Sequence, residues 1–305
     1  MLYEYMNMLG YSKKEIELIR SSHSLVNYKE ETLYNKVKDI FQCLLLIGYT
    51  SQEIKKMTKT YPSIYSYSVQ NIESKIEDMI EIGYTKDEIM KMTKLSPQIY
   101  GFDIESMSNQ IKDFVDYGFN NEDVIKMTKS FPALYNYDFK NNILVKIEEL
   151  MKLGYSKEEV IKMSITCPSL YSHKINDITL NDVINSIIKF RYTREDAIYI
   201  IKLYPQAIGG SIKNLEDKLN YYDSIDLHDI AIINPVRLMQ SVDLSYARYE
   251  FLKKEKKIVV TIDNFNKLFK SSGDFKKKYG ITKKELLEKY NYQEYLEKQN
   301  RLKTV

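Results

Sequence analysis

Lysines recur in this chain at fixed distances after a glycine. Gly48 is followed by Lys56 and Lys59, eight and eleven residues later, and the pair recurs in the next two repeats. One ammonium group per repeat could neutralise successive phosphates of a nucleic-acid backbone and release counterions. Lysine is a point charge, so such rows would hold a backbone without reading its sequence. The lysines of the two rows are Lys56, Lys59, Lys91, Lys94, Lys126, Lys129, Lys162 and Lys202.

A second group of lysines lies near the C-terminus. Residues 243–305 carry 16 Lys and Arg against 9 Asp and Glu, which is +7, whereas the preceding 242 residues carry 29 against 33, which is −4. Residues 276–278 are three consecutive lysines, and residues 253–257 read Lys-Lys-Glu-Lys-Lys. We predict nucleic-acid contacts in this region, in particular at Lys253, Lys254, Lys256 and Lys257.

The lysine rows have a second interpretation as an ordinary solvated helix face. At about 100° per residue, positions +8 and +11 after the glycine point away from the apolar positions +6, +9 and +13. Acidic residues such as Glu53, Asp87 and Glu88 are close in sequence, and the body of the chain is nearly neutral. The sequence leaves both interpretations open.

The helices that would carry these lysines belong to a repeat. The chain has six prolines, at spacings of 35, 35, 36, 37 and 30, and a glycine followed by an aromatic residue stands 14 residues before each of the first four. The same 14-residue offset from proline predicts two further corners, the turns between one repeat and the next, at Arg191-Tyr192 and Tyr221-Tyr222, where the glycine is absent. A fixed period of this length indicates an array of structural repeats.

Each repeat reads as two helices. Ser or Thr after the aromatic residue, with an acid three positions later, predicts a capping box in five copies, and Asn120 with Asp123 is a weaker version. The proline ends the first helix. A second N-cap follows six residues after the proline, and the glycine ends the second helix. The predicted second N-caps are Ser68, Asp103, Asp138, Ser211 and Ser241.

A hairpin of about 35 residues cannot bury both apolar stripes alone, so neighbouring repeats must stack. We therefore predict an all-α protein, an α-solenoid of about seven helix pairs over residues 1–242, with Met1–Leu9 as a front helix. Residues 243–305 depart from the rhythm and are predicted to form a basic helical C-terminal cap. Only five alanines occur, which argues against tetratricopeptide repeats, because their closely crossing helices need small residues.

The repeat resembles that of the mitochondrial transcription termination factor (mTERF) family. The matching features are Gly-Tyr-Thr-x-x-Glu-Ile, as at residues 48–54, then Pro-x-Ile-Tyr, as at residues 62–65, and a second helix ending in Ile-Gly-Tyr. The resemblance implies a helical-repeat protein that binds nucleic acid in a concave basic groove, with duplex DNA favoured as partner and RNA as the alternative. The N-terminus shows no organelle-targeting leader, so we expect a bacterial-type member.

The sequence offers little support for other classes of function. Three histidines have no partner at metal-ligand spacing, and no phosphate loop or nucleophile motif occurs, so we expect no enzyme, no metal and no cofactor. Two distant cysteines and the lack of a secretory signal or membrane span favour a cytoplasmic protein, and we expect a monomer. The alternative function is a protein-interaction scaffold. The tyrosines after each proline are predicted to be core residues with solvated hydroxyls, rather than stacking platforms for bases.

Overall fold

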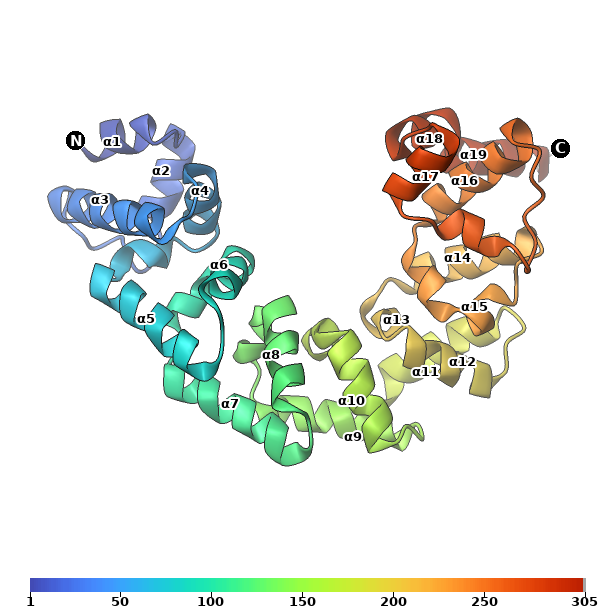
Figure 1. Cartoon of the computed structure of the whole chain (residues 1–305), viewed down its shortest axis with the longest axis horizontal. Helices are drawn as coiled ribbons and strands as arrows, with labels where there is room; N and C mark the ends of the chain where they lie inside the picture. The colour runs from blue at the N-terminus through green and yellow to red at the C-terminus, as the bar shows by residue number, and fades with distance from the viewer. Residues whose placement is uncertain (304–305) are drawn as a thin grey trace. The chain divides into compact units, whose positions relative to one another are not determined.

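A computed structural model describes residues 1–303, and helices are the only regular elements in this part of the chain (Figure 1). The predicted all-α helical-repeat fold is confirmed. The chain folds as two compact units. Unit 1 comprises Met1–Glu148 and Ser164–Tyr171, and unit 2 comprises Glu149–Met163 and Ser172–Val305. The boundary predicted at residue 242 between array and cap stays a prediction.

Each repeat contributes a first helix, a short turn of helix and a second helix. After the front helix α1 (Leu2–Met8), the first helices are α2 (Lys13–Arg20), α4 (Ser51–Thr60), α6 (Lys86–Leu95), α8 (Asn121–Ser130), α10 (Lys157–Thr166), α12 (Arg194–Leu203) and α15 (Ile230–Ile233). The second helices are α3 (Glu30–Ile47), α5 (Val69–Ile82), α7 (Ile104–Tyr117), α9 (Leu144–Lys152), α11 (Asp177–Ile188), α14 (Ile212–Ser224) and α16 (Val242–Glu255).

The proline of each repeat opens a short helical turn instead of an irregular loop. Five residues from the proline onward form a 3-10 helix in most copies, and the residue before the proline leaves helical geometry, as at Tyr61 with φ −137° and ψ 78°. These short elements are η1 (Pro62–Ser66), η2 (Pro97–Gly101), η3 (Pro132–Asn136), η5 (Pro168–Ser172), α13 (Gln206–Gly209) and η6 (Pro235–Met239).

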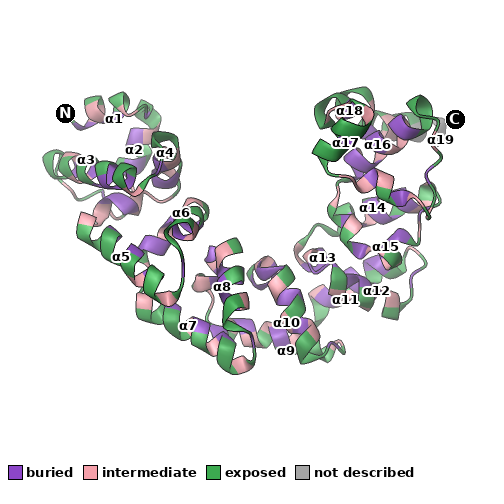
Figure 2. Ribbon diagram, in the orientation of Figure 1, coloured by how far each residue is buried: buried purple, intermediate pink, exposed green. Residues whose placement is uncertain are grey.

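Within unit 1 the helices pack in two layers. The first helices α2, α4, α6 and α8 pack each on the next, and the second helices α3, α5 and α7 do the same. Figure 2 shows buried residues on the helix faces between these layers. The apolar stripe of each helix is therefore covered by its own partner and by neighbouring repeats, which is how a repeat too small to have its own core is stabilised.

The caps are largely as predicted. All five capping boxes form, for example Thr50 with Glu53 and Ser156 with Glu159, and the five predicted second N-caps accept backbone N–H groups. The weaker version is wrong, since the Asn120 side chain makes no cap hydrogen bond. Gly48 ends α3 with φ 121°, a value that favours glycine because it has no Cβ.

One predicted corner is correct and the other is wrong. Arg191 takes a left-handed conformation with φ 67°, as expected where the glycine is lost. In contrast, α14 continues through Tyr221-Tyr222, and the chain turns at Asp226, with φ 57°. Leu227 N–H then donates to the Tyr222 carbonyl at 2.8 Å. Asp tolerates this conformation better than most residues. The turn therefore lies later in the chain than predicted, and the first helix that follows it, α15, is short.

The 36-residue spacing between Pro132 and Pro168 has a structural cause. The second helix of this repeat begins with a π-helix, η4 (Phe139–Ile143), before α9. A π-helical turn accommodates one additional residue inside a helix. The inserted residue is thereby absorbed without moving the caps at either end.

Part of the repeat pattern continues in the C-terminal region, which contains η7 (Phe265–Phe269), α17 (Ser272–Tyr279), α18 (Lys283–Lys289) and α19 (Tyr292–Lys303). Phe265 takes the place of the proline, and Ser271 caps the next helix six residues later. Gly280 then ends α17 with φ 78°, and Thr282 forms a capping box with Glu285. The lack of proline in this segment hides the resemblance in the sequence.

A buried hydroxyl network joins consecutive repeats. The hydroxyl of Tyr11, which follows the corner glycine, lies 2.7 Å from Thr58 Oγ1 and 2.9 Å from the Tyr65 hydroxyl of the next repeat. Because buried hydroxyls are costly without partners, this network fixes how one repeat seats on the next. The same triplet recurs as Tyr49, Thr93 and Tyr100, and as Tyr84, Thr128 and Tyr135.

Removing one of these hydroxyls is expected to destabilise unit 1. In the variant Tyr49→Phe, the Tyr100 hydroxyl loses its partner, so the free energy of unfolding should fall by about 1–3 kcal/mol, as measured by urea denaturation. The control is Tyr199→Phe, whose side chain is 39% exposed and should change stability by less than about 0.5 kcal/mol. Equal effects of the two variants would contradict a role for the network.

Candidate nucleic-acid interface

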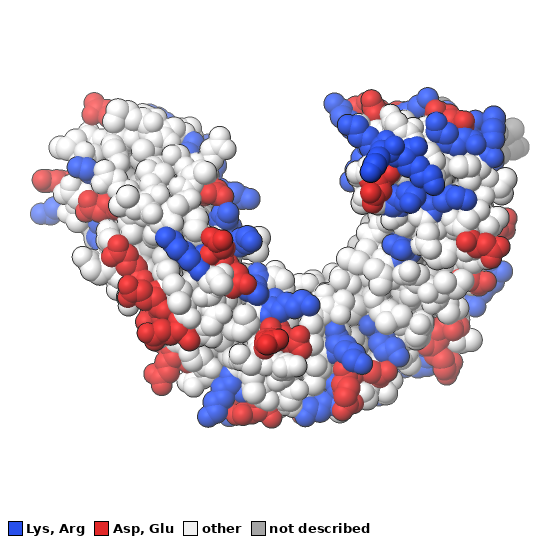
Figure 3. Space-filling view, in the orientation of Figure 1, with Lys and Arg blue, Asp and Glu red and all other residues white. Residues whose placement is uncertain are grey.

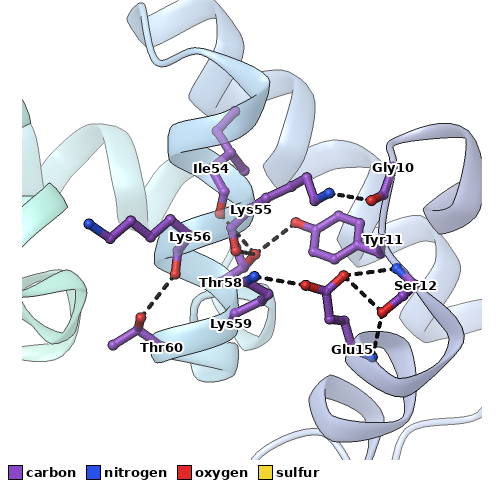
Figure 4. A network of polar contacts seen from close by, with 10 residues as sticks. All are labelled: Gly10, Tyr11, Ser12, Glu15, Ile54, Lys55, Lys56, Thr58, Lys59 and Thr60. Carbon is purple, nitrogen blue, oxygen red and sulfur yellow. Dashed lines mark hydrogen bonds and ion pairs between the residues drawn. The ribbon is translucent and has the colours of Figure 1, made fainter.

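The lysines at +11 are paired with glutamates. Each reaches back to the capping-box glutamate of the preceding repeat, as Figure 4 shows for Lys59 and Glu15. This pairing does not follow from the local sequence pattern, because the partner lies 41 to 44 residues away. The paired Nζ and Oε1 atoms are 2.7 Å apart in Lys59–Glu15, 2.8 Å in Lys94–Glu53, 2.6 Å in Lys129–Glu88 and 3.0 Å in Lys202–Glu159.

These pairs hold the glutamates in their charged form. The hydrogen bond from Lys94 and the backbone N–H of Thr50 lower the pKa of Glu53 to about 2, and Glu15 and Glu88 are lowered to about 2 in the same way. The glutamate thus caps its own helix and links it to the next repeat. A phosphate could reach this lysine only in competition with the glutamate.

Acid should therefore weaken the stacking of repeats. A carboxylate whose pKa is lowered on folding stabilises the fold above its unfolded pKa of about 4.5, and this stabilisation is lost as the pH falls toward 2. In the variant Glu15→Gln/Glu53→Gln/Glu88→Gln, urea denaturation should show a smaller loss of stability between pH 7 and pH 3 than in the unmodified protein.

A matched control separates these pairs from the general acid sensitivity of the protein. Three other glutamates, on the second helices, are exposed and make no ion pair with a described residue: Glu31, Glu81 and Glu105. Replacing these three by Gln should leave the acid dependence close to that of the unmodified protein. If both triple variants respond alike, the pairs do not stabilise the stacking.

The lysines at +8 point into solvent. Lys56, Lys91 and Lys126 are exposed and form no ion pair with any residue that the structure describes. Figure 4 shows Lys56 turned away from the network in which Lys59 takes part. Lys162 is also exposed, and its charge contributes to lowering the pKa of Glu159. In unit 1, consecutive stacked helices α4, α6 and α8 thus each present one unneutralised ammonium group at the same position.

The balance of charge differs between the two layers of unit 1. Figure 3 shows Lys and Arg along α4, α6 and α8, with Asp and Glu among them on α6 and α8, and a row of Asp and Glu along α5. The acids on α5 are Glu73, Glu77, Asp78 and Glu81. The surface of the first helices is therefore the side of this unit on which a phosphate backbone would meet least repulsion.

The C-terminal lysines form a second basic surface, in unit 2. Helices α16 and α18 pack together, and Lys289 of α18 pairs with Glu255 at the end of α16 at 2.8 Å. Lys254 is paired with Glu250 at 2.6 Å. Sequence reasoning did not include the lysines at the start of α18 in this surface. Its exposed members are Lys253, Lys254, Lys256, Lys257, Lys276, Lys277, Lys278, Lys283 and Lys284.

Several lysines, with one Gln and one Arg, have structural roles. Each stands seven residues after the N-cap of a second helix and donates a hydrogen bond to a carbonyl at the end of the next repeat's short helix. In the repeat with the π-helix the distance from the N-cap is eight residues. Burial lowers the pKa of Lys75, Lys146 and Lys218 in these positions. Such side chains are unavailable to phosphate. The contacts are Lys36 to Ser66, Lys75 to Phe102, Gln110 to Tyr137, Lys146 to Tyr171, Lys218 to Leu238 and Arg248 to Leu268.

The tyrosines after the prolines are not platforms for stacking bases. Tyr65 and Tyr171 are fully buried and Tyr100 is 4% exposed, so the predicted core role is confirmed for these three, whereas Tyr135 is only half-buried. Their hydroxyls are hydrogen-bonded to protein groups and not solvated, which corrects the second half of that prediction. Burial raises the pKa of Tyr65 well above its usual value, so the phenol stays neutral.

The described residues contain no cluster of three or more His, Cys, Asp or Glu side chains arranged to bind a metal ion. None of their helices has the length and apolar character required to cross a bilayer.

Comparison with known proteins identifies the repeat. No curated protein matches the chain. The model of the mTERF family matches residues 2–140, which contain the front helix, the first three helix pairs and most of the lysine rows. The capping box of the first helix and the proline turn each occur three times in this segment. The predicted resemblance to the mTERF family is therefore confirmed for residues 2–140.

Proposed function

We propose that this protein binds nucleic acid through phosphate contacts and acts by occupying its target, as a regulator of transcription or a related process. The observation that carries the proposal is the row of exposed lysines Lys56, Lys91 and Lys126 on consecutive stacked helices. Packed helices lie about 8–10 Å apart. Along one strand of a DNA duplex, successive phosphates are about 3.4 Å apart along the axis. The spacing between neighbouring helices therefore corresponds to roughly three phosphates.

Duplex DNA is the favoured partner, and structured RNA is the alternative. The contacts available are ammonium groups, which recognise the backbone of either polymer and do not distinguish bases. The C-terminal basic surface, which includes Lys253 and Lys257, adds a second set of contacts. The two buried, unpaired cysteines suit a reducing compartment, and we place the protein in the cytoplasm as a monomer without catalytic activity.

The test is fluorescence anisotropy with labelled duplex DNA, single-stranded DNA and an RNA hairpin at two salt concentrations. If the three exposed lysines of unit 1 each contact a phosphate, the logarithm of the duplex affinity should fall with the logarithm of salt with a slope of at least about −2.7. The duplex affinity should then fall at least about 40-fold between 50 and 200 mM salt. Failure to bind any of the three at low salt would exclude the proposal.

A further inference from the structure

A groove between second helices α3 and α5 differs from the rest of unit 1. It has a volume of about 470 Å³. Its apolar lining comes from Cys43 and Leu46 of α3 and from Ile76 of α5, and Glu73 and Glu77 of α5 form its acidic side. The groove lies on the layer of second helices, and none of the lysines Lys56, Lys91 and Lys126 lines it.

The array itself shows that this apolar lining is not required for packing. The position five residues before the corner glycine is Cys43 in this repeat and a carboxylate in the next three, at Asp78, Asp113 and Glu149. The position two residues before the glycine is Leu46 here and a charged residue in those same three repeats: Glu81, Asp116 and Lys152. The repeat folds with charged residues at both positions, so the apolar pair serves some other purpose.

The exposure of these side chains points to an unoccupied contact surface. Leu46 is 87% exposed, and two further apolar side chains of the same helices are partly exposed: Leu45 of α3 at 41% and Ile80 of α5 at 47%. Adjacent large apolar side chains on a protein surface mark sites of interaction more often than chance. Cys43 lies at the floor with a buried thiol, whose pKa is raised by burial and by Glu73, so this floor is neutral.

Charge decides which partner fits. Glu73 and Glu77 stand one helical turn apart on the same side of the groove, whereas its one cationic lining residue is Lys86. A phosphate backbone would be repelled here. A helix with an apolar stripe flanked by Lys or Arg would place a large apolar side chain over Cys43 and Ile76 and pair its cations with the two glutamates.

We propose that the groove between α3 and α5 docks a basic amphipathic helix of a partner protein. This site is independent of the proposed nucleic-acid surface, so the protein would bring such a partner to the nucleic acid that it occupies. Binding through this groove leaves the lysine row of the first helices free.

The experiment uses the full-length protein and a labelled peptide probe of Lys and Leu. The peptide has roughly 18 residues, five helical turns, with leucines on one face and a photoreactive leucine analogue at its centre. Anisotropy should show binding that is weakened about tenfold or more by Leu46→Asn and by Glu73→Gln/Glu77→Gln. The crosslink should map to residues 43–47 or 73–80. A peptide with Glu in place of Lys should not bind.

The matched control is Glu105→Gln/Asp116→Asn, which removes two exposed acids from α7 and should leave the affinity within about twofold. The proposal is overturned if this control weakens binding as much as the groove variants, since the peptide would then sense only net charge. It is also overturned if the crosslink maps elsewhere. A dimer of the unmodified protein that Leu46→Asn dissociates, as seen by light scattering, would assign the groove to a second copy instead.

Discussion

The variant Lys56→Gln/Lys91→Gln/Lys126→Gln is expected to lose about 10²- to 10³-fold in affinity for duplex DNA near 0.1 M salt. Each phosphate contact contributes about 0.9 to the slope of log affinity against log salt through counterion release. Three contacts therefore raise the affinity by about 2.7 powers of ten between 1 M and 0.1 M salt. The slope of log affinity against log salt should become shallower by about 2.7. Anisotropy titrations of the variant at several salt concentrations measure both quantities.

The control for this variant removes the same charge from the other layer. Lys38, Lys112 and Lys140 are exposed lysines at the second helices α3, α7 and η4. Their replacement by Gln lowers the net charge equally, and should reduce affinity far less and leave the slope nearly unchanged. If the two triple variants lose affinity to the same extent, binding depends on overall charge and the lysine row has no special role.

The variant Phe114→Ala should destabilise unit 1 by about 3–5 kcal/mol. Phe114 of α7 is fully buried and its ring lies 5.0 Å from that of Phe119 and 4.9 Å from that of Phe139, measured between centroids. It therefore joins α7 to the turn between α7 and α8 and to η4. Because each repeat is stabilised by its neighbours, a cavity at this position should lower the urea midpoint of the whole unit.

Val115, the next residue, provides the comparison for Phe114. It is 37% exposed, so Val115→Ala should change the free energy of unfolding by no more than about 0.5 kcal/mol. Circular dichroism at 222 nm in a urea titration measures both variants. A loss below about 1 kcal/mol in Phe114→Ala would show that the cluster of aromatic rings does not hold these repeats together.

Local features of the fold could be predicted from the sequence, because they depend on residues a few positions apart. Gly48 needs a left-handed conformation, Pro62 interrupts a helix, and Thr50 with Glu53 caps one, whatever surrounds them. The misplaced corner at Asp226 shows the limit of this reasoning. A residue that tolerates a left-handed conformation leaves a weaker signal than glycine does, and the 14-residue offset then pointed to the wrong position.

The candidate site was predicted less completely, because it depends on how repeats stack. Lys56 and Lys59 are equivalent in the sequence pattern, yet the first is exposed and the second is paired with Glu15 of the preceding repeat. Only the stacking of α4 on α2 brings that glutamate within reach. Likewise, Lys146 becomes a structural residue because a π-helix shifts it by one position, which no spacing rule for α-helices contains.

The central claim is that the exposed lysines of the first helices contact phosphate. Lysine acetylation of the free protein and of its complex with duplex DNA, read by mass spectrometry, tests it residue by residue. The account predicts that DNA protects Lys56, Lys91 and Lys126, while the control lysines of the second helices react as in the free protein. Equal reactivity of the first-helix lysines with and without DNA, in a complex shown to be formed, would contradict it.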